Sequence, residues 1–467
     1  MSQSSVLHLA DLIQESVQII DKLCKDNNFN IPDLSSPGFS TQSEAFRSNP
    51  AVADAAKITA AACMQLATSL LPPTDFLFSL AVGDSHSAAV RVCLEANVTE
   101  ILREAGPEGL HVDVIAAKCG LDAPKLSRII RYLTTHHVYR EVKPDVFTNN
   151  RISGTLDTRK SLKDITANPE GKYDSAGFPA LLSHHLDIDH KCSVVAWDTL
   201  KEGTTECSQE LTRTIFSRGL NVNMTYWDFF KHPDNHFRHR RFGFVMQGME
   251  AIQPSDMIFR AFNWNILGKD AIVVDVGGGI GIATMPLARR YTEINIVIQD
   301  LPNVVEEGKR FWKEKYPKAL QSGRVKLETH DFFEPQPIKG VSAFIVKQVL
   351  HNWPSTYIKK LLSRLREAAS KDAVLIIIDN VLPYACRVAE NERTDAKEEP
   401  EPLLPNYGAV CNSAYTLDMM MMFYFNSQEP TIKQLTDLLT STGWKIVKFR
   451  SIDPRSHFLK SVEAIPA

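Results

Sequence analysis

A run of glycines directly follows an apolar stretch, and the combination suits a nucleotide ligand. Residues 272–281 read Ile-Val-Val-Asp-Val-Gly-Gly-Gly-Ile-Gly, and a helix-forming stretch, 283–291, comes next. A second apolar run, 294–298, ends close to Asp300. Strand, glycine turn, helix, strand and carboxylate form the layout of a nucleotide-binding βαβ unit. Glycines let the backbone approach a ligand closely, and the carboxylate of Asp300 can accept hydrogen bonds from ribose hydroxyls.

The register of the glycines decides which nucleotide is expected. A dinucleotide fingerprint requires G-x-G-x-x-G, but Ile282 or Thr284 stands where the third glycine should be. The pattern that fits is an acid followed by alternate glycines: Asp275, Gly277, Gly279 and Gly281. This pattern resembles the first motif of class I S-adenosylmethionine (SAM) methyltransferases, in which the acid takes part in the site and the turn lies against the amino-acid part of SAM. A NAD or FAD site and a purely structural turn are the alternatives.

A histidine follows a later apolar run and suits proton transfer. The segment Lys-Gln-Val-Leu-His-Asn-Trp, 347–353, comes directly after the expected strand 341–346. Strand ends of a doubly wound sheet form its ligand crevice. Because the pKa of histidine lies near neutral pH, His351 can remove a proton from a hydroxyl group. A second segment of this kind, 329–333, contains Asp331 and Phe332, which can bind and cover an adenine ring.

Composition and charge narrow the classes of protein to consider. At 467 residues, the chain is long enough for about two to three domains with a large core. Its hydrophobic content of 44% and charged content of 23% are ordinary for a soluble globular protein. The net charge of −3 provides no field that would attract nucleic acid or an anionic membrane, so we expect neither as a partner. The eight cysteines lack C-x-x-C spacing, which leaves zinc and redox-dithiol sites unsupported.

We expect a cytoplasmic protein. No apolar run approaches the roughly 18 to 20 residues that span a bilayer. The start of the chain, Met-Ser-Gln-Ser-Ser-Val-Leu-His, lacks the basic and apolar regions of a signal peptide. Scattered cysteines also suit a reducing compartment.

The first 80 residues are expected to form a helical extension. Apolar positions recur at helical spacing over 5–27 and over 51–71, on either side of a Pro- and Ser-containing stretch. Pro72 and Pro73 end the second helix. The apolar face of this segment needs a partner, either in the rest of the chain or in a second subunit, and we expect a homodimer.

The pattern of residues 81–155 predicts a winged-helix module. Three helices and two strands are expected, over 89–105, 111–119, 123–136, 138–142 and 146–149. Such a module can bind DNA. The expected recognition helix carries only Lys125, Arg128 and Arg131, however, which is a modest charge for phosphate contacts. A scaffold or dimerisation domain is therefore the preferred interpretation.

The rest of the chain predicts an α/β fold. Residues 156–255 are expected to be a helical, aromatic-rich linker that contributes to a substrate pocket. Over 256–467, buried parallel strands alternate with helices in a Rossmann-like sheet, with strands at 271–276, 294–299, 341–346 and 373–379. An acidic insert at 386–411 is expected to be solvated and disordered.

The motifs together resemble a known family. Asp-Val-Gly-Gly-Gly-Ile-Gly, Gln-Asp-Leu-Pro, His-Asp-Phe-Phe and Leu-His-Asn-Trp, in this order and spacing, are similar to the plant caffeate-type O-methyltransferases and their fungal relatives. The similarity is strong over 270–455, weaker over 86–255, and architectural only in the first 80 residues. It implies a class I methyltransferase domain behind a mainly helical, winged-helix dimerisation domain.

The resemblance also implies roles for individual residues. SAM would lie along the glycine turn, and S-adenosylhomocysteine would be the product. Further contacts to SAM would come from Asp300, Leu301, Asp331, Phe332 and Lys347. His351 would be the general base, flanked by Asp379 and Glu429, and no metal is expected. Asp379 stands where the plant enzymes commonly have Glu, one methylene longer, so its role follows less directly than that of Glu429.

For the acceptor we expect a small phenol or enol of secondary metabolism. Methionines adapt to flat aromatic ligands, and the expected pocket residues are Trp227, Phe242, Met246, Met422 and Asn426. Two other readings stay open: a non-catalytic SAM-binding scaffold or regulator, and a methyltransferase of the same fold that acts on nitrogen or carbon. The presence of His351 favours oxygen, because such relatives often dispense with the histidine.

Overall fold

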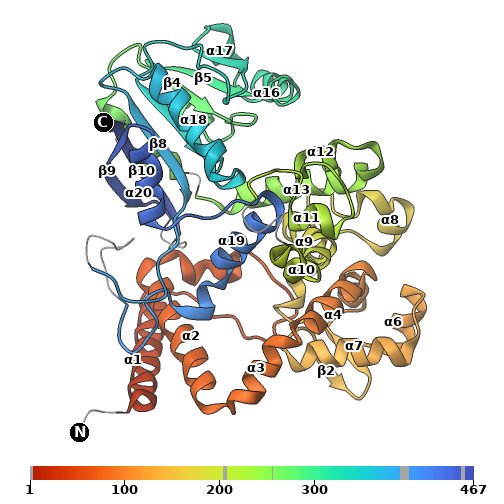
Figure 1. Cartoon of the computed structure of the whole chain (residues 1–467). Helices are drawn as coiled ribbons and strands as arrows, with labels where there is room; N and C mark the ends of the chain where they lie inside the picture. The colour runs from red at the N-terminus through yellow and green to blue at the C-terminus, as the bar shows by residue number, and fades with distance from the viewer. Residues whose placement is uncertain (1–3, 203–207, 255, 390–398, 454–457) are drawn as a thin grey trace. The chain divides into compact units, whose positions relative to one another are not determined.

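The computed structural model describes residues 4–202, 208–254, 256–389, 399–453 and 458–467. The chain divides into two compact units. Unit 1 comprises residues 1–197 and 216–252, and unit 2 comprises residues 198–215 and 253–467. Figure 1 follows the chain through both. The finer division at residues 80, 155 and 255 stays a prediction. No helix of the described ranges is both long enough and apolar enough to cross a membrane.

Unit 1 is mainly helical, as predicted. Its helices are α1 (Ser5–Asp26), α2 (Pro50–Leu70), α3 (Pro73–Ala81), α4 (Gly83–Glu95), α5 (Val98–Ala105), α6 (Val112–Cys119), α7 (Ala123–Thr135), α8 (Leu162–Ala167), α9 (Gly177–Ser193), α10 (Ala196–Lys201), α11 (Ile215–Gly219), α12 (Tyr226–Lys231) and α13 (His236–Ile252). Three short strands, β1 (Leu110–His111), β2 (Arg140–Lys143) and β3 (Val146–Thr148), form a sheet in the order β1-β3-β2. Helices α10 and α11 lie at the junctions between the units.

Local sequence explains where these helices begin and end. Ser4 accepts a hydrogen bond from the N–H of Leu7 and begins α1, and Asn49 does the same for Ala51 at the start of α2. The helix predicted over 89–105 is wrong as a single element. Asn97 adopts a left-handed conformation with φ 58°, which ends α4 and begins α5.

Unit 2 is built on a seven-stranded sheet in the order β6-β5-β4-β7-β8-β10-β9. The strands are β4 (Ile272–Val276), β5 (Asn295–Asp300), β6 (Val325–Thr329), β7 (Ala343–Lys347), β8 (Val374–Asn380), β9 (Trp444–Ser451) and β10 (Leu459–Pro466). Strands β6, β5, β4, β7 and β8 pair in parallel, whereas β10 runs antiparallel to β8 and β9. The predicted class of fold and its four parallel strands are confirmed.

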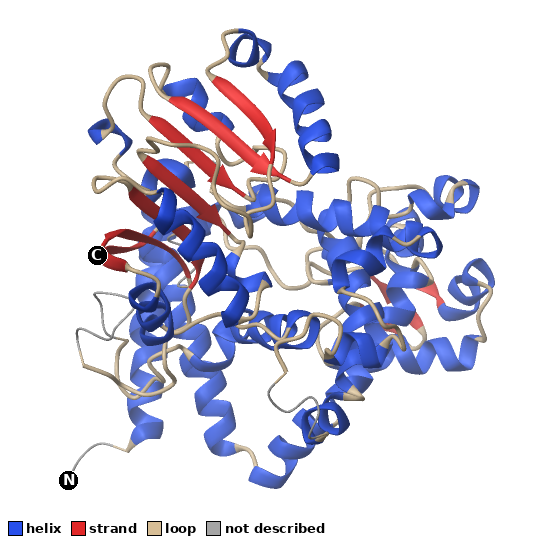
Figure 2. Cartoon of the chain, turned by 45° about the horizontal axis from the view of Figure 1, so that its top comes forward, coloured by secondary structure: helices blue, strands red, loops and turns tan. Residues whose placement is uncertain are grey.

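Helices cover both faces of this sheet, as Figure 2 shows. They are α14 (Met257–Ala261), α15 (Met285–Arg290), α16 (Pro302–Lys315), α17 (Pro317–Gln321), α18 (Ser355–Ala368), α19 (Asn412–Phe425) and α20 (Ile432–Ser441). One hydrophobic cluster contains Val273 and Ile376 and the other contains Val274 and Ile377, so successive strand residues enter opposite layers. Burial on both faces explains why these strands are apolar throughout.

The acidic insert is only partly described. Residues 390–398, which hold most of its acidic side chains, lie outside the described residues. The part that follows is not uniformly solvated, because Leu403, Tyr407 and Cys411 are buried. Asn406 donates a hydrogen bond to the hydroxyl of Tyr415 on α19. Residues 399–411 are therefore partly packed, and disorder of the insert as a whole stays a prediction.

Two glycines allow α9 and α13 to approach each other closely in unit 1. A Cβ atom on Gly177 would lie 2.5 Å from the Cα atom of Gly248, and one on Gly248 would lie 2.6 Å from the Cα atom of Gly177. Backbone atoms occupy these positions, so no side-chain rotation can relieve the overlap. Gly243, on the same helix, has no atom within 4 Å of its Cβ position.

We predict opposite effects of alanine at the two α13 positions. Gly248→Ala should destabilise unit 1 by about 1–3 kcal/mol, because it overpacks a helix contact. Gly243→Ala, the matched control, should be neutral or stabilising by up to about 1 kcal/mol through helix propensity. Differential scanning calorimetry of both variants measures the shift in unfolding midpoint. Equal midpoints would contradict the close contact.

Candidate active site

The glycine turn after β4 has the conformations that its residues suggest. Gly277, Gly279 and Gly281 all have positive φ angles, of 64°, 58° and 79°. Residues other than glycine rarely adopt positive φ angles, because their Cβ atoms clash with the backbone. A Cβ atom on Gly279 would meet nothing within 4 Å, so this part of the turn has an open face. One on Gly281 would lie 2.6 Å from Ile298 and from Trp312, so that end of the turn packs on the core.

Asp300, at the end of β5, holds the turn in place. One carboxylate oxygen accepts the N–H of Gly279 at 2.8 Å, and the other accepts the N–H of Leu301 at 2.7 Å. Burial raises the pKa of this carboxyl group, against the effect of the two backbone donors. Asp275 lies under the turn and is 1% exposed; a Cβ atom on Gly278 would be 2.5 Å from its carboxyl carbon.

The other predicted cofactor residues follow neighbouring strands. Asp331 comes after β6, and its carboxylate accepts the N–H of Phe333 at 2.9 Å. Phe332 lies beside the turn, since a Cβ atom on Gly277 would be 3.4 Å from its ring. Lys347 ends β7 and donates a hydrogen bond to the side chain of Gln348. The structure therefore brings Phe332 and Asp300 to the turn; the contacts of all these residues with a cofactor stay predictions.

His351 lies in a short 3-10 helix, Leu350–Asn352, directly after β7. Its Nδ1 atom is 2.8 Å from Oε1 of Glu429 and 3.5 Å from Oδ1 of Asp379. A single Nδ1–H can be donated to Glu429, and the Nε2 atom is then left to accept a proton. Gln348, between β7 and this helix, has a φ of 51°, an uncommon conformation of the kind found at functional sites.

The two acids come from different elements. Asp379 lies near the end of β8, and Glu429 follows α19. All three side chains are buried. Asp379 Oδ2 and Glu429 Oε2 make no hydrogen bond within the described part of the chain. One ring nitrogen of His351 and one carboxylate oxygen each of Asp379 and Glu429 lie within 4.8 Å of one another, a spacing that could also hold a metal ion. The hydrogen bond between Nδ1 and Glu429 instead favours a general base that is oriented by two acids.

Further residues position this triad and were not identified from the sequence. Ser427 Oγ lies 2.6 Å from the backbone oxygen of His351 and 2.8 Å from that of Trp353. Asp418, on α19, accepts the N–H of Glu429 at 2.7 Å. Asn380 donates to Glu429 Oε1 at 3.3 Å. Only one feature of the sequence points to Ser427: it lies between Asn426 and Glu429, two predicted site residues.

The carboxylates change the pKa of the histidine. Burial alone would lower it, but the negative charges of Asp379 and Glu429 and the hydrogen bond to Glu429 outweigh burial and raise the pKa of His351 to about 9. Burial is also the main reason that the pKa of Asp379 is raised, to about 7. His351 is thus a stronger base than an ordinary histidine.

The predicted acceptor residues divide between the units. Asn426 and Met422 belong to unit 2, where the Asn426 amide donates to the backbone oxygens of Glu210 and Arg213 at 2.9 Å. Trp227, Phe242 and Met246 belong to unit 1. There the rings of Trp227 and Phe242 lie 6.3 Å apart, and Met246 is 47% exposed. Their contacts with an acceptor stay predictions.

Comparison with known proteins identifies relatives over the whole chain. A family model described as "O-methyltransferase domain" matches residues 197–445. "4-O-methyltransferase 1" of Phanerochaete chrysosporium is 43% identical over 99% of this chain and 100% of its own length. "3-O-methyltransferase 2" of the same fungus is 30% identical over 94% of each chain.

Solved structures share the fold at lower identity. The structure of "OxaC in complex with sinefungin and meleagrin" is 19% identical, with a TM-score of 0.65 over 97% of this chain and 99% of that one. The structure of "LepI complex with SAM" is 16% identical, with a TM-score of 0.64 over 98% of this chain and 100% of that one. These matches confirm the architecture predicted from the sequence.

The raised pKa can be measured directly. In a long-range ¹H–¹⁵N NMR titration, the ring of His351 should titrate near pH 9, because the carboxylates stabilise its protonated form. Glu429→Gln removes one of these charges and should move the titration to lower pH. Asp437→Asn, on the exposed surface of α20, serves as the control and should leave it unchanged. An unshifted titration in Glu429→Gln would contradict the coupling.

Proposed function

We propose that this chain, which belongs to the O-methyltransferase family, transfers a methyl group from S-adenosylmethionine to the hydroxyl group of a small phenol or enol. Family membership confirms the class of enzyme predicted from the sequence. The observation that carries the rest is the 2.8 Å contact between His351 Nδ1 and Glu429, because it leaves a basic nitrogen free beside the cofactor end of the sheet.

The described residues fit the cofactor. The turn of Gly277, Gly279 and Gly281 has an open face at Gly279, and Asp300 presents a carboxylate at the end of the neighbouring strand. A carboxylate oxygen can accept more than one hydrogen bond, so Asp300 can hold ribose hydroxyls as well as the turn. Leu301, Asp331, Phe332 and Lys347 complete the proposed contacts. When bound, S-adenosylmethionine supplies an electrophilic methyl group on a positively charged sulfur.

The residues of the triad then have distinct tasks. His351 Nε2 takes the proton of the acceptor hydroxyl as the O–H bond breaks, which leaves oxygen as the nucleophile for the methyl group. The resulting imidazolium is stabilised by Glu429 through the hydrogen bond and by Asp379 through its charge. Ser427 fixes the backbone of His351. The enzyme contributes mainly proximity, orientation and one base, and no step requires a metal.

The acceptor is proposed to be a small aromatic compound of secondary metabolism. Trp227, Phe242, Met246, Met422 and Asn426 are proposed to contact it, since aromatic rings and methionine thioethers pack against flat ligands. The solved structure titled "NcsB1 … in complex with S-adenosylmethionine (SAM) and 2-hydroxy-5-methyl naphthoic acid" shows a protein of this fold with an aromatic ligand.

A direct assay tests the function. The protein is incubated with methyl-labelled S-adenosylmethionine and a panel of phenols, enols, carboxylic acids and amines, and labelled products are identified by mass spectrometry. Label on oxygen of a phenol or enol supports the proposal. Label on nitrogen or carbon would assign a different acceptor atom, and no label with any class would favour a non-catalytic scaffold.

The roles of His351 and Asp300 predict two separable losses. His351→Ala should lower kcat by about 10²- to 10⁴-fold, the usual contribution of a general base, with little change in affinity for S-adenosylmethionine. Asp300→Ala should weaken that affinity by about 1.5–3 kcal/mol, since it removes a charged hydrogen-bond partner. Each variant is the control for the other. Turnover by His351→Ala above about a tenth of wild type at saturating substrates would remove it as the base.

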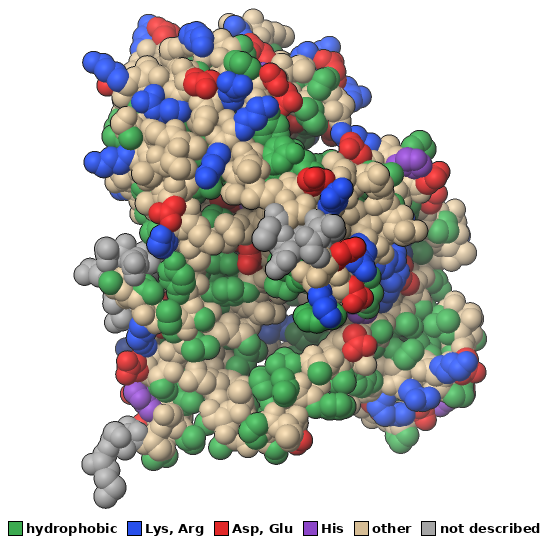
Figure 3. Space-filling view, viewed as in Figure 1, with side chains coloured by type: hydrophobic (Ala, Val, Ile, Leu, Met, Phe, Trp, Pro, Cys, Tyr) green, Lys and Arg blue, Asp and Glu red, His purple; other side chains and the backbone are tan. Residues whose placement is uncertain are grey.

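A homodimer is proposed through unit 1. Helix α3 exposes Leu77, Phe78 and Leu80, which are 67%, 68% and 62% accessible, and Figure 3 shows hydrophobic side chains on this surface. Burying such a patch against a second subunit is favourable. The winged-helix module at residues 81–155 is proposed to belong to the same dimerisation domain.

Light scattering tests the assembly. The protein should show about twice the chain mass of 52.3 kDa at micromolar concentration. Phe78→Glu should lower the apparent mass, because it places a charge in the proposed interface. Gln321→Glu, at an exposed position in unit 2, is the control for added charge. A wild-type protein that scatters as a monomer would contradict the proposal.

A further inference from the structure

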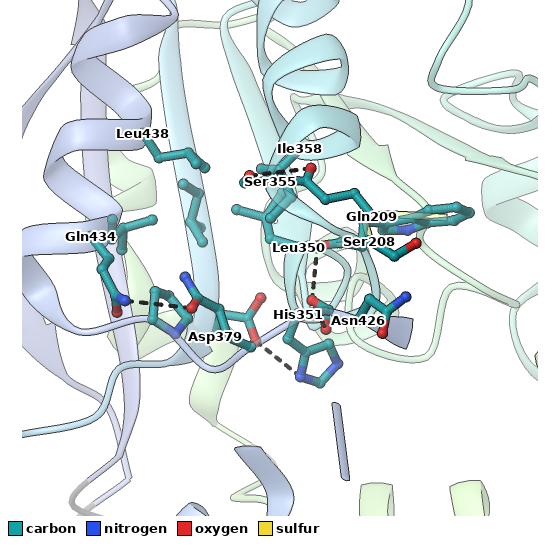
Figure 4. A pocket seen from close by; sticks show the side chains of 16 residues that line it. Ser208, Gln209, Leu350, His351, Ser355, Ile358, Asp379, Asn426, Gln434 and Leu438 are labelled. Atoms are coloured by element: carbon teal, nitrogen blue, oxygen red, sulfur yellow. Dashed lines mark hydrogen bonds and ion pairs between the residues drawn. The ribbon is translucent and has the colours of Figure 1, made fainter. Parts of the chain in front are cut away.

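Unit 2 contains a cavity beside the triad, which shares His351, Asp379 and the proposed acceptor residue Asn426 with the methyl-transfer site. Its volume is about 330 Å³. The lining comes from the 3-10 helix Leu350–Asn352 and Trp353, from α18, β8 and α20, from the segment after α19, and from residues 208–209 (Figure 4). No glycine of the cofactor turn lines it, nor does Asp300. It is therefore distinct from the proposed cofactor site.

The cavity extends from the triad towards solvent. His351 and Asp379, which are buried, line one part, whereas Gln428 and Gln434, which are exposed, line another. Because buried and exposed residues share the same cavity, a small molecule can enter beside α20 and reach the triad.

An unsatisfied carboxylate oxygen faces this space. Asp379 is 3% exposed, and its Oδ2 atom has no hydrogen-bond partner within the described ranges. Figure 4 shows one oxygen of Asp379 directed at His351 and the other turned to the cavity. An unpaired buried oxygen costs free energy that a bound hydroxyl group would recover.

The lining defines the chemistry of the occupant. Its apolar wall includes Leu350, Ile358, Ile377 and Leu438, which suits a hydrocarbon or aromatic body. Neither lysine nor arginine occurs among the described lining residues, so nothing there would favour an anion. The volume is larger than the roughly 150 Å³ of an apolar cavity that holds benzene, so it is enough for a single aromatic ring with a substituent.

We infer that this cavity is a second binding site for small neutral aromatic alcohols such as phenols, whose hydroxyl group donates to Asp379 Oδ2. It touches the triad from the side of Asp379, which faces Nδ1 of His351, whereas proton removal uses Nε2. A hydroxyl group that donates to Asp379 Oδ2 is not the one that gives its proton to His351 Nε2. It changes the surroundings of the acid that helps to set the charge of His351.

Crystallography with 4-bromophenol locates the site. A soaked crystal of the full-length protein should give an anomalous bromine signal between β8 and α20. Leu438→Trp, which fills the cavity from α20, should abolish this signal. Leu438→Ala, at the same position, enlarges the cavity and should retain it. A wild-type crystal without a bromine signal there would overturn the inference.

Solution binding shows that the site does not depend on the lattice. Titration with 4-fluorophenol, followed by ¹⁹F NMR, should reveal one saturable site fewer in Leu438→Trp than in wild type or Leu438→Ala. 4-Fluorotoluene, which lacks the hydroxyl group, should bind this site at least tenfold more weakly. Equal numbers of sites in all three proteins, or equal affinity for both ligands, would refute a phenol site at Asp379.

A kinetic consequence rests on the proposed function. If phenols are acceptors, high acceptor concentrations should inhibit wild type and Leu438→Ala, and Leu438→Trp should lose this inhibition. The two ideas fail separately, because the binding experiments need neither cofactor nor turnover. Bound 4-fluorophenol in a protein that never methylates phenols would leave the cavity site intact and overturn only the proposed acceptor.

Discussion

The buried contact between an imidazole and two carboxylates is the constraint around which unit 2 is arranged. Charges are costly to bury unless they are paired, and here the imidazole that takes up a proton faces two acids. Each member comes from a separate element: the turn after β7, the end of β8 and the segment after α19. The parallel sheet brings the first two to the same edge because the carboxyl ends of its strands meet there. Ser427 and Asp418 hold the third against them.

Much of this arrangement could be predicted from the sequence, because it depends on local patterns. Glycine spacing after an apolar strand indicated the cofactor turn, and a histidine after another such strand indicated the base. Asp379 and Glu429 were identified only through family resemblance. They lie 28 and 78 positions from His351 in the chain, and nothing in their immediate sequence states that they meet.

Some elements could not be predicted from the sequence, for physical reasons. β6 and β9 lie at the two edges of the sheet and alternate apolar with charged residues, so they lack the continuous apolar run of central strands. The break at Asn97 depends on a single backbone angle inside a good helical pattern. Ser427 bonds to the backbone oxygen of His351. Because every residue type has this oxygen, the sequence does not predict the hydrogen bond.

The hydrogen bond between Gly279 and Asp300 has a consequence for how fast and how tightly a ligand can bind. It fixes the middle of a turn in which Gly277, Gly279 and Gly281 have left-handed conformations. A flexible glycine loop would lose backbone entropy on binding, at about 1–2 kcal/mol for each residue that becomes ordered. Here folding has already met that cost, so the free energy of contact goes into affinity and the turn needs no ordering step before it accepts a ligand.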